Sequence, residues 1–194
     1  MKFLLGFLLG VLAVPATVYV YLRVGHLPVA VADEPFLLER ELVSTALHAR
    51  IDKEMPGLAP IQPSQTNLEA GAHIYRQQCA ACHGVYGRPS RFADHMYPDA
   101  PELWAPHGDG VVGVSDDPPG ETYWKIANGI RLTGMPAFDK VLSPTQMWQV
   151  TWLLARADKP PPAGVLHVLK QPLDLDPAAL ATSSNASATS PDGK

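Results

Sequence analysis

The two cysteines of the 194-residue chain lie three positions apart and are followed at once by a histidine, in Cys79-Ala80-Ala81-Cys82-His83. This C-x-x-C-H spacing is the signature of covalent c-type haem attachment. Two thiols at the end of a helix can reach the two vinyl groups of one porphyrin, and the next residue can direct its imidazole at the iron. The motif therefore predicts one covalent haem c held by Cys79 and Cys82, with His83 as an iron ligand.

Three other chemistries use closely spaced cysteines, and each lacks a feature that it needs. A thioredoxin-like redox pair requires a βαβ setting, which the sequence does not predict. A zinc site requires further ligands, and the remaining candidates His95, His107 and His167 follow no zinc spacing. A disulfide between residues three apart would be strained. Covalent haem is the reading that the motif favours.

The sixth position of a haem iron is either filled by a second side chain or left open for chemistry. The sequence offers thioether and imidazole candidates at Met55, His73, His95, Met96, His107, Met135 and Met147. Met135 lies between Gly134 and Pro136, where glycine permits close backbone approach and proline stiffens the loop. We predict Met135 as the second iron ligand, with His95 or His107 as the alternative. Met55 and Met147 are expected to pack, His73 to lie on the surface, and Met96 to lie outside the ligand loop.

Helical patterns around the motif predict an all-α fold with long loops. Helices are expected over residues 68–78 and 121–127, the second ending at Asn128-Gly129, which is typical of a left-handed helix end. A third helix is expected to begin with the capping box of Ser143, Pro144 and Gln146. The chain contains 20 Pro and 15 Gly, which predicts long irregular stretches between the helices. A loop-rich unit of this size buries little apolar surface, so the macrocycle is expected to complete its core.

The N-terminal run Phe3–Leu22 is apolar and uncharged, and a helix of that length spans the hydrocarbon core of a bilayer. We predict an uncleaved membrane anchor over residues 1–23. The alternative is a signal peptide cleaved after Ala32, because residues 30–32 have the small-x-small form of a cleavage site. We further expect a stalk helix and Pro-rich linker over residues 24–62, with Asp33 as the cap of a helix reaching about Lys53. The haem domain is expected over 63–158, followed by a disordered tail over 159–194 with a docking segment near 165–175.

The chain resembles the class I c-type cytochromes, in particular the bacterial membrane-anchored monohaem type. The resemblance covers residues 67–156 and rests on Gly71-x-x-x-Tyr75-x-x-x-Cys79-x-x-Cys82-His83, Pro101-Glu102-Leu103, Asn128-Gly129, Gly134-Met135-Pro136-Ala137-Phe138 and the last helix with its tryptophans. It implies the class I cytochrome c fold, with three main helices and long loops around one haem. It also implies that Gly71 and Tyr75 pack the first helix against the last, near Trp148, Trp152 and Leu153. The carbonyl of Pro101 is then expected to accept a hydrogen bond from His83.

Two arginines of the loop after the motif, Arg88 and Arg91, are candidates for hydrogen bonds to the haem propionates. Their alternative is an ordinary solvated position. The sequence does not distinguish these readings.

These features predict a membrane-tethered one-electron carrier without a small-molecule substrate, since two protein ligands leave the iron no open position. Its partners would be redox proteins in or at the membrane. The expected location is the bacterial inner membrane, single-pass, with the haem domain on the periplasmic side. The 15 basic and 19 acidic residues form no basic run, which argues against nucleic-acid binding. A haem subunit of a larger dehydrogenase or oxidase is an alternative, and a gas-sensing or peroxidatic haem protein is a further one.

Overall fold

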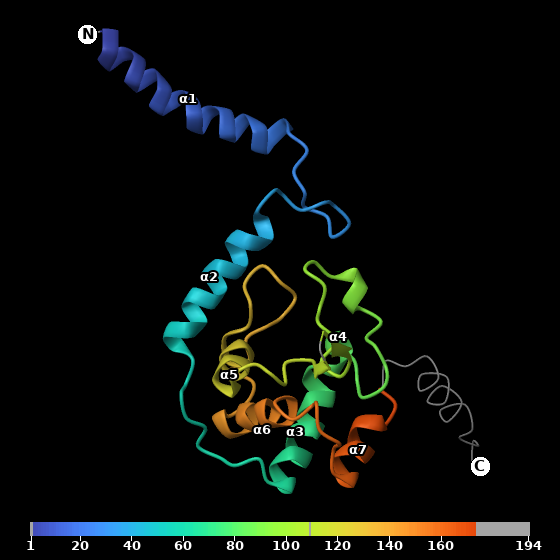
Figure 1. The fold of residues 1–194 in the computed structure, drawn as a ribbon. Coiled ribbons are helices and arrows are strands. Elements are labelled where there is room, and N and C mark those ends of the chain that lie inside the picture. The colour runs from blue at the N-terminus through green and yellow to red at the C-terminus, as the bar shows by residue number, and fades with distance from the viewer. Residues whose placement is uncertain (1, 109, 174–194) are drawn as a thin grey trace, which may run out of the picture. The chain divides into compact units, whose positions relative to one another are not determined.

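The computed structural model describes residues 2–108 and 110–173, and the chain divides into two compact units after Leu42. Figure 1 shows the order of the elements along the chain. The predicted all-α class is confirmed in the described residues, since helices dominate and the strands are two residues long.

The first unit contains helix α1 (Lys2–Val24), in which Pro15 is the only proline. By length and composition its segment Gly6–Val24 could cross a membrane, and signal sequences have the same properties. The segment after α1 differs from the expected start of a stalk helix. The carboxylate of Asp33 accepts hydrogen bonds from the backbone N–H groups of Val29 and Ala30, both at 2.8 Å, so it closes a turn and caps no helix.

Helix α2 (Glu39–Glu54) begins in the first unit and continues into the second, which starts at Val43. Ile51 is fully buried there. The stalk expected over 24–62 is therefore not a uniform tether, because its part from Val43 onward is folded into the same unit as the cysteine motif.

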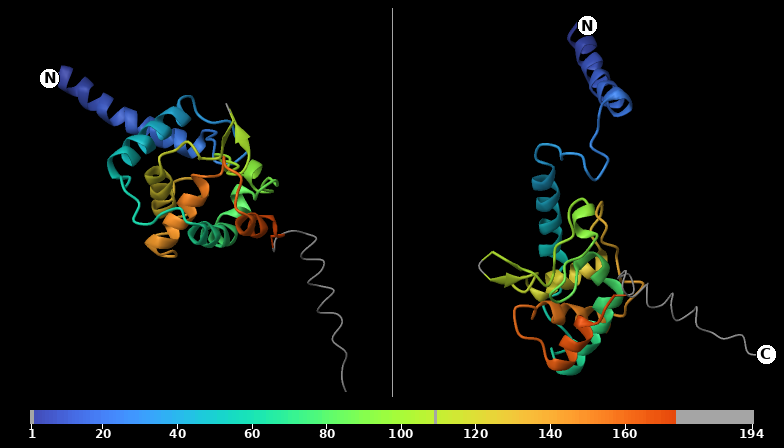
Figure 2. Two further views of the ribbon diagram at one scale, coloured as in Figure 1. Left: turned by 60° about the horizontal axis from the view of Figure 1, so that its bottom comes forward. Right: turned by 90° about the vertical axis from the view of Figure 1, so that its right-hand side faces the viewer.

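Two helices form the foundation of the second unit: α3 (Gln65–Gln78) and α6 (Pro144–Leu154), which pack against one another (Figures 1 and 2). At their contact Gly71 lies against the backbone of Gln149, where a Cβ atom would collide with the carbonyl oxygen. Glycine is thus required for the close approach. The capping box of α6 is present as expected, whereas α3 is capped by Ser64 and begins at Gln65, three residues before its expected start at residue 68.

Further elements follow in the second unit. They are the single turn α4 (Ala80–His83), the 3-10 helix η1 (Ala93–His95), the hairpin β1 (Pro106–His107) and β2 (Val111–Val112), α5 (Pro119–Asn128) and α7 (Ala163–Lys170). The antiparallel hairpin projects from the unit (Figure 2). Helix α5 packs against α6 and ends at Gly129, whose φ of 64° is positive as its sequence predicted, although its ψ of −176° lies outside the left-handed helical region.

The segment after residue 158 departs from the expected disordered tail. Helix α7 packs against α3, with Val165 and Leu169 almost fully buried, in agreement with the docking segment expected near 165–175. Its apolar face explains the difference, because it buries enough surface to offset the cost of ordering. The rest of the predicted tail, residues 174–194, lies outside the described residues.

The aromatic contacts also differ from those that the resemblance implied. Tyr75 is fully buried, and its ring meets Trp104 edge to face at 5.7 Å between centroids. Trp148 instead stacks on Tyr123 at 4.4 Å, and Trp152 donates a hydrogen bond to the carbonyl of Ile61. The aromatic partner of Tyr75 thus comes from the long loop, which sequence patterns had not singled out.

Candidate functional site

The second unit encloses an apolar cavity with about 260 Å³ of solvent-accessible space. The motif residues Cys79, Cys82 and His83 line one part of it, and residues of α2, α5 and the loop around Met135 line others. The structure therefore brings together residues that are separated by more than fifty positions in the chain. The lining is almost wholly apolar, as expected of a site for a flat hydrophobic macrocycle.

The motif is positioned by the end of α3, where the chain passes at Cys79 directly into the single turn α4. The carbonyl of Cys79 accepts hydrogen bonds from the backbone N–H groups of Cys82 and His83. From the α3 side, the buried hydroxyl of Tyr75 donates to the carbonyls of Gly84 at 2.8 Å and His83 at 3.2 Å. Burial raises the pKa of Tyr75 well above its ordinary value, so this hydroxyl keeps its proton and remains a donor.

The imidazole of His83 is held in one orientation by a hydrogen bond of 2.8 Å between Nδ1 and the carbonyl oxygen of Pro101. A carbonyl can only accept, so Nδ1 carries the proton. Burial lowers the pKa of His83, although this hydrogen bond and the charge of Glu102 act in the opposite direction. The lowered pKa favours the neutral imidazole ring. In the neutral ring Nε2 then has a free lone pair, which is the state that binds iron.

The two cysteines are free thiols, and both line the cavity. Burial, followed by the proximity of Cys82, raises the pKa of Cys79 to about 12, so its thiol is neutral at physiological pH. The described residues contain no group of three or more His, Cys, Asp or Glu side chains arranged to hold a metal ion.

The loop that carries Met135 is tied closely to the end of α5. The backbone N–H of Met135 donates to the Thr133 hydroxyl at 3.1 Å, and its carbonyl accepts from Ile130 at 3.2 Å. Phe138 donates to the carbonyl of Ile126, and the positive φ of Gly129 brings the loop back across the helix end. These bonds fix the backbone on both sides of Met135, whose side chain is half-buried and lines the cavity.

Among the other predicted ligand candidates, only Met96 also lines this cavity. Its methyl group occupies the space beside Gly134 where a Cβ atom would lie, so Met96 packs directly on the loop that carries Met135. Met96 thus lies on a different segment from the loop that carries Met135, as expected, but it reaches the same cavity. The remaining candidates lie elsewhere: Met147 in the core, Met55 against α5, His107 on the hairpin, and His73 and His95 exposed.

The two arginines considered for the propionates are not among the residues that line the cavity. Arg88 donates to the backbone carbonyl of Gln171 at 3.0 Å, and Arg91 is exposed on the surface. Two polar residues of α5 face the cavity instead, Thr122 and Lys125. The Thr122 hydroxyl is buried and has no hydrogen-bond partner in the described part of the chain, which fits a site completed by a bound group with polar atoms.

The sequence did not indicate Lys125, because its four-residue spacing from Glu121 is that of an ordinary ion pair on a helix surface. Its ammonium forms ion pairs with Glu121 at 2.7 Å and with Asp117 at 3.1 Å. Burial alone would lower the pKa of Lys125, but hydrogen bonds and charge contacts with the two carboxylates raise it above 10.5 overall. Lys125 therefore stays charged at the wall of an apolar cavity.

The fold and this site define a c-type cytochrome domain, and comparison with known families agrees. Residues 66–152 match the family described as cytochrome c oxidase, cbb3-type, subunit III. Neither the curated proteins nor the solved structures that were compared show a significant match. Residues 66–152 thus match a c-type cytochrome domain, which supports a role in haem-based electron transfer and implies haem c as the cofactor.

Replacing Lys125 by Gln should lower the reduction potential, because a positive charge at the cavity wall favours the reduced iron and its loss leaves two carboxylates unpaired. The ion pairs are present below the usual lysine pKa of 10.5 and are lost as pH rises through the raised value. The wild-type potential should therefore fall toward that of Lys125→Gln in strongly alkaline solution. Potentiometric titration of both proteins measures this.

The matched control is Lys140→Gln, since Lys140 is 88% exposed, pairs with Asp139 and does not line the cavity. Equal potentials for the two variants would contradict the assignment of Lys125 to the electrostatics of the site.

Proposed function

We propose that the second unit is a one-electron carrier with a single haem c, attached through Cys79 and Cys82 and ligated by His83 and Met135. The observation that carries the proposal is the pair of independently fixed side chains at one cavity. His83 is oriented by Pro101 with Nε2 available, and Met135 stands on a loop that is held by hydrogen bonds to Thr133 and Ile130 within the loop and, beyond Met135, by hydrogen bonds to α5.

The bound cofactor would supply one-electron iron chemistry, and the protein supplies two ligands that remain in place in both oxidation states. A closed coordination sphere leaves no position for a substrate, which supports electron transfer over catalysis. A thioether ligand stabilises the reduced iron relative to a second imidazole, so Met135 would give a higher potential than bis-histidine ligation. The apolar lining acts in the same direction by keeping water from the iron.

We further propose that α1 tethers this unit to the inner membrane with the haem domain on the periplasmic side. The support is the apolar helix segment Gly6–Val24, whose one charged residue is Arg23 in its last turn, together with covalent haem chemistry, which in c-type cytochromes is usually extracytoplasmic. The haem unit has seven basic and ten acidic side chains over residues 63–158. Its redox partners are proposed to be membrane proteins whose docking does not depend on a strongly basic surface.

A second candidate is a haem subunit of a larger oxidase or dehydrogenase, which the description of the matched family favours. Purification from detergent-solubilised membranes distinguishes the two proposals. An isolated carrier is recovered alone, whereas a subunit is recovered with stoichiometric partners.

Covalent attachment predicts that the denatured chain keeps one haem. Intact mass should exceed that of the polypeptide by one haem, and the denatured band should retain haem peroxidase staining. Cys79→Ala and Cys82→Ala should each lose one thioether and yield less folded protein, since the macrocycle completes the core. Haem released completely by acid-acetone extraction of the wild type would contradict the assignment.

The identity of the sixth ligand is tested by Met135→Ala. The oxidised wild type should show the weak near-infrared charge-transfer band of sulfur on ferric iron, and the variant should lose it, gain carbon monoxide binding and fall in potential. Met135→His should restore a closed low-spin site at a lower potential than the wild type, because imidazole favours ferric iron more than thioether does.

The matched control is Met147→Leu, since Met147 is buried in the core and does not line the cavity. If Met135→Ala keeps the band and Met96→Leu loses it, Met96 is the ligand. Rapid carbon monoxide binding by the wild type would instead support the gas-sensing or peroxidatic alternative.

The membrane anchor predicts that the full-length protein needs detergent for extraction and keeps Met1 or Lys2 at its N-terminus. Fractionation and N-terminal sequencing measure both properties. A mature protein that begins at Asp33 and is free in the periplasm would show that the segment is a cleaved signal peptide.

A further inference from the structure

Helix α2 lies outside residues 66–152, which match the cytochrome family, yet it forms part of the cavity wall. Leu47 and His48 line the cavity, and Ile51, one turn further along, is fully buried. Ser44, Leu47 and Ile51 share one face of the helix by their three- and four-residue spacing, and all three are at least partly buried. This face of α2 is therefore turned toward the haem unit.

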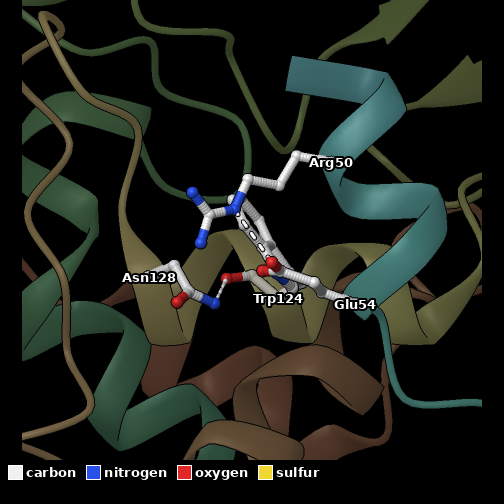
Figure 3. Close-up of polar contacts among 4 residues, drawn as sticks. All are labelled: Arg50, Glu54, Trp124 and Asn128. Carbon is white, nitrogen blue, oxygen red and sulfur yellow. Dashed lines mark hydrogen bonds and ion pairs between the residues drawn. The ribbon is translucent and has the colours of Figure 1, made fainter. Parts of the chain in front are cut away.

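The end of α2 is attached to α5 by a side-chain contact shown in Figure 3. The carboxylate of Glu54 accepts a hydrogen bond of 3.1 Å from the buried indole N–H of Trp124 and one of 3.0 Å from Arg50 on its own helix. These bonds, that of Arg50 first, lower the pKa of Glu54 and keep it ionised. Asn128 donates to the carbonyl of Trp124, which links the contact to the end of α5.

The backbone that follows α2 also approaches α5 closely, one turn before Trp124. The carbonyl of Pro56 lies where a Cβ atom of Gly120 would be, so the segment after α2 lies directly on the first turn of α5. Glycine is the residue type that permits this approach.

Helix α5 thus has two neighbours. Thr122, Lys125 and Ile126 face the cavity, while Trp124 and Gly120 meet α2 and its following segment. Because α5 also holds the Met135 loop through the carbonyl of Ile126, the attachment of α2 is fixed relative to the proposed ligand.

We propose that α2 is a built-in cover of the haem: Leu47 packs on one edge of the macrocycle, and Glu54 is a positioning residue that holds the helix there through Trp124. The inference rests on the proposed haem site and deepens it. By excluding water from that edge, the helix disfavours the more highly charged ferric form and raises the reduction potential.

The direct test is nuclear magnetic resonance of the reduced full-length holoprotein. The methyl groups of Leu47 should be shifted upfield by the porphyrin ring current and should show nuclear Overhauser contacts to a haem proton. The methyls of Leu42, on the same helix but 67% exposed and outside the cavity lining, should have ordinary shifts. Leu47 methyls at ordinary shifts in a protein with covalent haem would overturn this inference alone. Absence of covalent haem would overturn the proposed function.

The functional test compares Leu47→Ser with Leu42→Ser. Leu47→Ser should lower the potential and accelerate oxidation of the reduced protein by ferricyanide several-fold. The oxidant then reaches the uncovered haem edge more easily, and the lower potential of the protein increases the driving force for its oxidation. Leu42→Ser should leave both unchanged. Equal behaviour of the two variants would overturn the covering role.

The positioning role of Glu54 is tested by Glu54→Ala and Glu54→Gln. Glutamine keeps an acceptor oxygen for Trp124 and loses only the exposed ion pair with Arg50, so Glu54→Gln should keep the wild-type potential and Leu47 shifts. Glu54→Ala should move both toward the values of a protein without the cover. If Glu54→Ala keeps the wild-type potential and Leu47 shifts, Glu54 has no positioning role.

Discussion

The hydrogen bond from His83 Nδ1 to the carbonyl of Pro101 determines which nitrogen of the imidazole can bind a metal ion. Other contacts of the site keep His83 where this hydrogen bond can form. The hydroxyl of Tyr75 donates to the carbonyls of His83 and Gly84. The turn that carries His83 is therefore held by the protein itself and does not need a bound group for its position. Because Tyr75 belongs to α3 and Pro101 to the long loop, the imidazole is oriented only when helix and loop are packed together.

The foundation for that packing is the contact of α3 with α6, where Gly71 allows the two backbones to meet. Close helices at this point leave their other surfaces free to support the cavity, and Val150 and Leu154 of α6 contribute to its lining. A cavity of this kind is costly in a protein whose interior is otherwise close-packed. The cost is offset when an apolar macrocycle fills it, which explains why a loop-rich unit can be stable.

The site has a charged lysine at the wall of an apolar cavity. Lys125 lines an apolar cavity, and its charge is balanced by ion pairs with Glu121 and Asp117, which are not among the lining residues. A buried ammonium without partners would lose its proton, whereas this arrangement keeps it charged. Helix α2 instead places the apolar side chain of Leu47 at the cavity. Its charged residue Glu54 accepts a hydrogen bond from Trp124 outside the cavity lining. In our proposal both features tune the site without supplying a ligand to it.

The sequence by itself predicted the covalent attachment, because the spacing of Cys79, Cys82 and His83 is a local property of one helix end. It also determined the capping box at Ser143 and the helix end with positive φ at Gly129, which depend on side chains and dihedral angles of neighbouring residues. Only the tertiary structure decided which distant residues reach the cavity. Met96, Lys125 and Leu47 carry no local signal of this role, while Arg88 and Arg91 carry a charge but point elsewhere. The direction of a side chain in a long loop, or on a helix paired through its surface, is set by packing between elements, and no spacing along the chain encodes it.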